Sequence, residues 1–198
     1  MLADTSDMAG SRVIALTAAF AAVAALAAAG PASAATDPTS VSIAAGSLEY
    51  TTPLTAGNFP NVTLDGTQKI VSANVSPYVI TDSRGGSAGW NLTIEASQFT
   101  SAGSDTLPQG SLLMALPPVP TKNAVTNPLG LPPTVALTLD AIDNGTAQKV
   151  VSAAALPLVG AGAWTVTPLP NALTLTVPAV VPPGTYTSTI TTTLSTGP

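Results

Sequence analysis

The sequence predicts an all-β fold, an antiparallel β-sandwich of the immunoglobulin-like or a similar type, and three observations support this prediction. From Thr36 onward apolar and polar residues alternate with a period of two, and helical periodicity is almost absent. Turn-forming pairs such as Asp65-Gly66 and Asn144-Gly145 separate the alternating stretches. Threonine, a β-branched residue that suits a pleated surface, dominates the polar positions. Strands with one apolar and one polar face are typical of antiparallel sheets that pack on a core.

Residues 1–34 are predicted to be a cleaved, helical signal peptide. An uncharged apolar run over 13–29 follows Arg12, and 32–34 supply the small residues of a processing site. The alternative is a permanent membrane anchor, for which this run is short against a hydrocarbon core of about 30 Å. We expect residues 35–40 to form a short linker and residues 41–198 to form the domain.

Four stretches show the alternation most clearly and are predicted strands: 90–97, 134–140, 172–177 and 185–195. In the first, Trp90, Leu92 and Ile94 share one face, and the residues between them form a polar face. In the last, the face expected to point inward carries Tyr186, Ile190, Thr192 and Leu194. Segments 66–73 and 145–153 have similar sequences, which either two similar strand pairs or a duplication would explain.

The stretch 115–133 is rich in proline and cannot be a central strand, because proline donates no ladder hydrogen bond. It is either a linker between two domains or a long excursion from one sandwich. The excursion is favoured, since each half alone has too few strands to close a core.

Composition excludes several classes of function. The chain has 10 Asp+Glu, 5 Lys+Arg, no His and no Cys, with a formal net charge of −5. A Ser-His-Asp triad, a thiol nucleophile and a thiolate zinc site are therefore impossible. The few Lys and Arg residues are scattered along the sequence and form no basic cluster that would bind the phosphates of a nucleic acid. We expect no enzyme activity, no cofactor and no nucleic-acid partner.

The acidic residues offer two weak candidates for chemistry. Asp140, Asp143 and Asn144 beside Gly145 provide oxygen donors, but calcium takes six to eight, so an ordinary Asx turn is the favoured interpretation. Glu49 and Glu95 are the only glutamates and would have to form any glycosidase pair. Nothing in the sequence brings them together.

Several ordered motifs resemble those of a known family. Ser87–Ile94 reads SAGWNLTI and is similar to a proximal Trp-x-Leu signature, while residues 184–198 resemble the distal strand of the same domain. Segments 149–153, 162–166 and 175–178 fit the approach to that strand. Together they resemble the WxL domain over about 41–198. The distal motif usually carries a second Trp-x-Leu, and here Thr192-Thr193-Leu194 stands in its place.

The resemblance implies a secreted protein at the surface of a Gram-positive cell, associated non-covalently with the wall, through peptidoglycan. It implies a motif-based set of ligand-binding residues: Trp90, Leu92, Trp164, Tyr186 and Leu194. Each aromatic ring in this set could instead belong to the core, which is favoured for Trp90 and Tyr186. The chain ends without a sorting signal or basic tail, so we expect no covalent anchor and no membrane span after cleavage. The alternative function is a structural or protein-interaction subunit of a surface assembly, with other surface proteins as partners.

Overall fold

A computed structural model of the chain describes residues 39–86, 88–123, 130–136 and 140–197. The expected signal peptide, residues 137–139 of the expected strand 134–140, and residues 124–129 of the proline-rich stretch lie outside the described residues. The chain divides into two units, Met1–Ile43 and Ala44–Pro198. In the first unit the described residues are 39–43, which are exposed and have no regular structure.

Every regular element in the described part of the second unit is a β-strand, which confirms the prediction of an all-β fold. The strands are β1 (Leu48–Thr52), β2 (Lys69–Ala73), β3 (Tyr78–Asp82), β4 (Trp90–Ala96), β5 (Thr100–Ser101), β6 (Leu112–Met114), β7 (Thr121–Lys122), β8 (Thr134–Val135), β9 (Gln148–Ala153), β10 (Gly162–Val166), β11 (Leu173–Val177), β12 (Tyr186–Thr187) and β13 (Ile190–Thr196).

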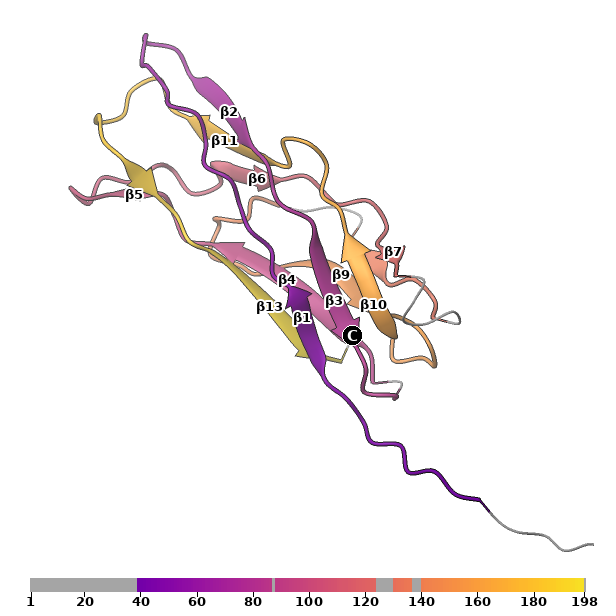
Figure 1. Cartoon of the computed structure of the whole chain (residues 1–198). Helices are drawn as coiled ribbons and strands as arrows, with labels where there is room; N and C mark the ends of the chain where they lie inside the picture. The colour runs from indigo at the N-terminus through magenta and orange to yellow at the C-terminus, as the bar shows by residue number, and fades with distance from the viewer. Residues whose placement is uncertain (1–38, 87, 124–129, 137–139, 198) are drawn as a thin grey trace, which may run out of the picture. The chain divides into compact units, whose positions relative to one another are not determined.

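The first layer consists of two sheets that continue one another, with strand orders β1-β3-β10-β7 and β2-β11-β6. β3 pairs antiparallel with β10, and β2 pairs antiparallel with β11. Because β2 directly precedes β3 and β10 directly precedes β11, these pairs form one long antiparallel ribbon with a break in its middle. β6 and β7 follow the ribbon on its β11–β10 side. Figure 1 shows β2, β11 and β6 above β3, β10 and β7.

The second layer has the order β13-β4-β9-β8, and the short pair β12-β5 extends it. All its pairings are antiparallel. The register between β4 and β13 runs from Trp90↔Thr196 to Ala96↔Ile190 without a shift. The two sequence motifs that suggested a family therefore lie side by side as neighbouring strands.

The core lies between the layers. On β4 the side chains of Trp90, Leu92, Ile94 and Ala96 are buried and alternate with half-buried polar residues, as the sequence predicts. The first layer contributes a matching set of fully buried side chains: Tyr78, Ile80, Val166 and Leu173. Full burial of such a side chain stabilises the fold by about 1.5–3 kcal/mol.

The stretch 185–195 is two strands rather than one. The break lies at Ser188 and Thr189, which bind Ser97 instead of continuing the ladder. Thr189 N donates to the Ser97 hydroxyl, and Ser97 N donates to Thr189 O, both at 2.9 Å. The sequence-based prediction that Tyr186 belongs to the same strand as Ile190 is therefore wrong, because a side chain from another part of the chain interrupts the alternation.

The proline-rich stretch contributes one short strand at the edge of the first layer. β7 pairs with β10 alone among the described strands, and Pro120 directly before it explains why it does not begin earlier. The residues before and after this stretch belong to the same compact unit, Ala44–Pro198.

Candidate functional site

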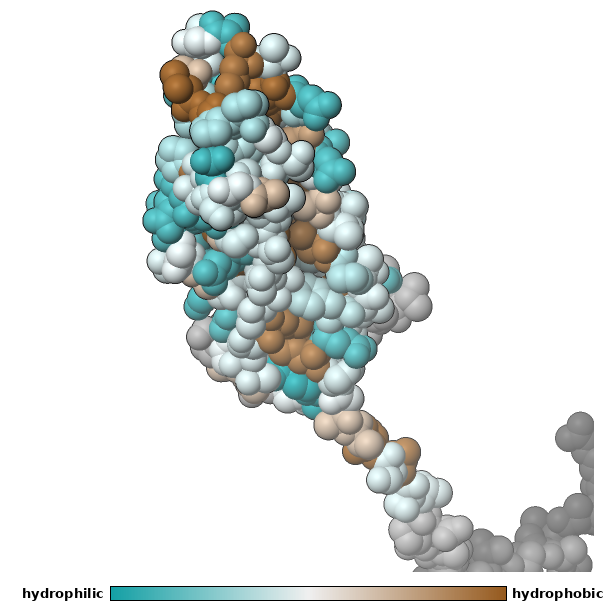
Figure 2. All heavy atoms as spheres, turned by 90° about the vertical axis from the view of Figure 1, so that its left-hand side faces the viewer, coloured by the Kyte–Doolittle hydropathy of each residue, from teal (hydrophilic) through white to brown (hydrophobic). Residues whose placement is uncertain are grey.

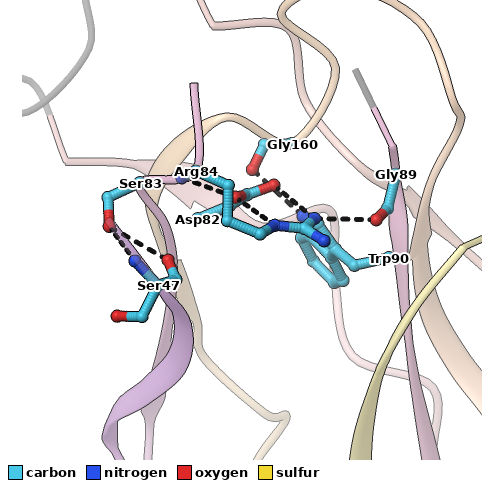
Figure 3. A network of polar contacts seen from close by, with 7 residues as sticks. All are labelled: Ser47, Asp82, Ser83, Arg84, Gly89, Trp90 and Gly160. Carbon is cyan, nitrogen blue, oxygen red and sulfur yellow. Dashed lines mark hydrogen bonds and ion pairs between the residues drawn. The ribbon is translucent and has the colours of Figure 1, made fainter. Parts of the chain in front are cut away.

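The indole of Trp90 is enclosed at the start of β4. The residue is 0% exposed, and its Nε1 donates a hydrogen bond to the carbonyl oxygen of Gly160 at 3.1 Å (Figure 3). A Cβ at Gly160, whose φ is +65°, would lie 2.7 Å from that same nitrogen. The loop before β10 is thus shaped to the edge of the indole, and the ring offers no surface to a ligand.

Gly89, the residue before the motif, connects three parts of the chain. Its carbonyl oxygen accepts hydrogen bonds from Arg84 Nη2 at 2.8 Å and from Gly197 N at 3.2 Å. Its φ is +68°, and a Cβ there would lie 2.5 Å from the carbonyl oxygen of Ala153, so the position requires glycine. Asn91 Nδ2 also donates to Gly197 O at 2.8 Å. The proximal motif therefore holds the end of the distal strand.

Asp82 and Arg84 form a bidentate ion pair beside this point. Nε lies 2.8 Å from Oδ1 and Nη2 lies 2.9 Å from Oδ2 (Figure 3). The hydrogen bond to Asp82 raises the pKa of the Arg84 guanidinium. The Ser83 hydroxyl accepts a hydrogen bond from Ser47 N at 2.9 Å and donates to Ser47 O at 3.0 Å, which ties the start of β1 to the same corner (Figure 3). Since both charges are partnered, the network holds a corner of the fold and leaves little free charge for a ligand.

Leu92 and Leu194 are directly opposite one another on β4 and β13, and both face the core. Thr192, which stands in the place of the second motif Trp, also lies on the inward face, opposite the buried Ile94. This agrees with the alternation predicted for 190–194.

Tyr50 faces the position of the missing ring, and Tyr78 is a second buried tyrosine of the first layer. Tyr50 from β1 packs on the core, and its hydroxyl lies near enough to Thr192 for that side chain to act on its pKa. The hydroxyls of Tyr50 and Tyr78 are buried and make no hydrogen bond of ordinary geometry within the described residues. Burial raises the pKa of both phenols. The volume that a tryptophan would need at position 192 is thus bordered by the phenol of Tyr50 from the opposite layer.

Trp164 lies in the middle of β10 and is also enclosed. It is 2% exposed, and its Nε1 donates to Ala161 O at 3.1 Å. The ammonium of Lys122, on the edge strand β7, lies 6.0 Å from the centre of the indole ring. Because Lys122 of β7 lies over the ring and the residue is almost fully buried, Trp164 presents no free face for stacking on a sugar.

Tyr186 is the member of the motif-based set that lies at an accessible surface. Its ring is half-buried, and its hydroxyl donates to Pro182 O at 2.8 Å. It lines an open groove of about 1080 Å³, and the described residues of the lining include no Asp, Glu, Lys or Arg. Phe59 and Phe99 meet edge to face in this groove, with ring centres 6.0 Å apart. The motif residues therefore do not form one common site.

The face of β4 and β13 that points away from the core carries a regular array of polar side chains, which we call the outer face. Its members on the two strands are Asn91, Thr93, Glu95, Thr191, Thr193 and Ser195. They oppose one another in register as Asn91↔Ser195, Thr93↔Thr193 and Glu95↔Thr191. Lys149 and Ser152 of β9 continue the rows on the other side of β4. The alternation predicted the polar face of β4 and that of Thr191 and Thr193, but not that the two faces lie side by side.

Asp143 and Asn144, which were considered above as oxygen donors for calcium, take part in hydrogen bonds within the fold. Asp143 is 1% exposed, and its Oδ1 accepts hydrogen bonds from Gly110 N and Leu112 N, both at 3.1 Å. Asn144 forms the Asx turn, accepting from Thr146 N at 2.9 Å. Within the described ranges no three His, Cys, Asp or Glu residues are grouped so as to hold a metal ion.

The two glutamates lie on opposite sides of the sandwich. On β1 the inward residue is Tyr50, so Glu49 points out of the first layer, and on β4 the buried Ile94 places Glu95 on the outside of the second layer. Packed sheets are about 10 Å apart, and outward side chains are farther apart than that. This exceeds the separation of about 5–9.5 Å at which two carboxylates act on one glycosidic bond.

Comparison with known proteins places these features in a family. No curated protein and no solved structure matches the chain. In the described part of the chain, no helix is long and apolar enough to cross a membrane. The family model for the WxL domain, described as surface cell wall-binding, matches residues 34–198 and so covers both motif strands and the compact unit. The chain belongs to the WxL family of surface proteins that bind the cell wall.

Proposed function

We propose that this protein is exported, that it is held at the wall non-covalently by peptidoglycan, and that the outer face of β4 and β13 makes the contact. The observation that supports the proposal most directly is that alternate residues of β4 point to opposite faces of the sheet. Trp90, Leu92 and Ile94 point into the core, while Asn91, Thr93 and Glu95 between them point out.

The geometry of the outer face suits a repeating polymer. Outward residues recur about every 6.7 Å along a strand, and neighbouring strands are about 4.8 Å apart, which gives a regular grid of hydroxyl and amide groups. Such groups exchange hydrogen bonds with the hydroxyl and amide groups of a glycan and its peptides. A regular grid makes many weak contacts, each of about 0.5–1.5 kcal/mol.

Four members of the motif-based ligand set have an indirect role in this proposal. Trp90, Leu92 and Leu194 pack in or against the core and support the sheet that presents the grid, while Trp164 is buried on β10 of the other layer. Tyr186 lies at the groove instead, away from the outer face.

Charge contributes little to the proposed contact. The outer face carries one acid, Glu95, and one base, Lys149, in rows that β4 and β9 place side by side. Attachment should therefore change little with salt, since exposed charges are largely screened at physiological ionic strength.

The test is sedimentation of the mature protein with purified peptidoglycan at low and at high salt. Retention in the pellet at both salts is the expected result. Protein that stays soluble at both salts would refute wall attachment through this polymer. Release by moderate salt alone would show an electrostatic contact, with anionic wall polymers as the better candidates.

A further inference from the structure

The residues just before the sandwich expose large apolar side chains. Residues 39–45, which we call the arm, read TSVSIAA and carry no charge. Val41 is 83% exposed and Ile43 is 87% exposed, and they alternate with the polar Ser40 and Ser42. In an extended chain the two β-branched side chains would share one face. This is the pattern of a half-buried strand, but nothing in the described part of the chain covers it.

The groove at Tyr186 has the complementary properties. Its lining includes the half-buried apolar side chains of Phe59, Val71 and Val181. Val71 belongs to β2, and Thr187 of β12 also lines the groove. β2 and β12 are each the outermost strand of their sheets, so each has one edge without a ladder partner among the described strands. Apolar surface also gathers at the end of the unit that carries the start of β2 (Figure 2), where Ile70 and Val180 are exposed.

The groove lies where the two layers separate. Farther along the same side β1 and β13 approach each other, and Tyr50 reaches Thr192 across the seam. Beyond β1 residues 54–64 line the groove and contact the first layer through the isolated bridge Ala56↔Val75 and the hydrogen bond from Gly57 N to Asn74 O at 2.8 Å. A seam with half-buried apolar walls and free strand edges is suited to receive an added strand.

The arm cannot reach the groove of its own chain. It joins the sandwich just before β1, where Gly46 N donates to Ser83 O at 3.0 Å. Along the chain the groove begins at Leu54, and the extended strand β1 that separates it from the arm alone spans roughly 13 Å at about 3.3 Å per residue. Val41 is three residues from Ala44, a reach of at most about 11 Å. An arm that fills a groove must therefore come from a second molecule.

From this complementarity we infer that the arm of one copy docks in the groove of another as an added β-strand, with Val41 and Ile43 packing against its half-buried apolar side chains. Neither surface carries charge, so burial of apolar side chains and strand pairing drive the contact. The arm and the groove are different surfaces, so the contact is head to tail and does not close on itself. The expected products are linear chains of copies.

The test is the mass of the mature protein by light scattering over a range of concentrations. The wild type should grow in mass with concentration, while Val41→Asp/Ile43→Asp should stay monomeric with an unchanged melting temperature. The matched control is Val119→Asp, at a position 61% exposed that belongs to neither the arm nor the groove, and it should assemble like the wild type. A monomeric wild type at every concentration, or equal assembly of the arm variant, would overturn the inference.

A mixing experiment tests the groove itself. Val181→Asp alters a half-buried groove residue and leaves the arm intact, so alone it should be monomeric. Mixed with the arm variant, which keeps an intact groove, it should form dimers of one copy of each and nothing longer. A labelled peptide of residues 37–46 should bind the arm variant at least ten times more tightly than it binds Val181→Asp. Absence of mixed dimers, or displacement of the peptide by oligosaccharides of N-acetylglucosamine, would reject arm docking. Sedimentation with peptidoglycan should be the same for both variants, because neither changes the outer face.

Discussion

The carbonyl oxygen of Gly160 accepts a hydrogen bond from Trp90 Nε1 at 3.1 Å, and the same glycine leaves no room for a side chain beside the indole. The contact joins residues 70 positions apart and locates the motif Trp in the core. It also explains why the loop before β10 needs a glycine: φ is +65°, and a Cβ would lie 2.4 Å from the Cβ of Ala153.

Gly160→Ala should therefore destabilise the fold by about 2–5 kcal/mol, combining a left-handed backbone of about 1–2 kcal/mol with overpacking of about 1–3 kcal/mol. The matched control is Gly66→Ala, which has φ +80° but nothing within 4 Å of the added Cβ, and so should cost only the backbone part. Urea unfolding of both variants measures the difference. Equal costs would mean that the indole edge does not constrain this loop.

Asp143 should stabilise the fold as a buried hydrogen-bond acceptor rather than through its negative charge. Asp143→Ala leaves Leu112 N without a partner in the core, at a cost of about 1–3 kcal/mol before any loss of packing. Asp143→Asn keeps the accepting oxygen and removes a buried carboxylate whose Oδ2 has no partner among the described atoms, so it should be close to the wild type. Chemical denaturation of the three proteins at pH 7 compares them, and a strongly destabilised Asn variant would show that the charge itself is required.

The fold should lose stability at alkaline pH because of its tyrosines. Burial raises the pKa of Tyr50 and Tyr78 above the ordinary value of 10.0, so the folded protein favours the neutral phenols. This contribution is fully present below pH 10 and is lost as the pH rises above it, since only the unfolded chain ionises freely.

Phenolate absorbance near 295 nm should consequently rise later in the native protein than in the chain unfolded in urea. Tyr78→Phe removes the more strongly shifted group and should move the native curve toward that of an ordinary tyrosine. Identical curves for native and unfolded protein would contradict the burial of these phenols.

Local patterns predicted the elements that depend on neighbouring residues. The alternation of Trp90, Leu92 and Ile94 gave the inward face of β4, and Asn144 forms the expected Asx turn. Each of these features depends only on residues within one strand or one turn. The hydrophobic periodicity or the turn-forming residues are therefore enough to predict it.

Features that depend on distant contacts could not be predicted in this way. The break between β12 and β13 arises at Ser97, about 90 positions earlier in the chain, and the covering of Trp164 depends on Lys122 from the proline-rich stretch. Asp143 lies next to a turn residue in sequence but points inward to Leu112 N. The groove is assembled from separate segments, so no single stretch of sequence carries its signature.

The central claim is that the Trp-x-Leu side chains hold the fold while the outer face of the same strands contacts the wall. The most direct measurement is the fraction of folded protein bound to purified peptidoglycan for three variants. Thr191→Val/Thr193→Val removes two exposed hydroxyls from the outer face and keeps the β-branched shape, and it should bind several times more weakly with an unchanged melting temperature. Thr174→Val/Thr176→Val makes the same change on β11 of the other layer and should bind like the wild type. Trp90→Phe should melt at a lower temperature yet bind equally well per folded molecule. Full binding by Thr191→Val/Thr193→Val together with lost binding by folded Trp90→Phe would contradict the account.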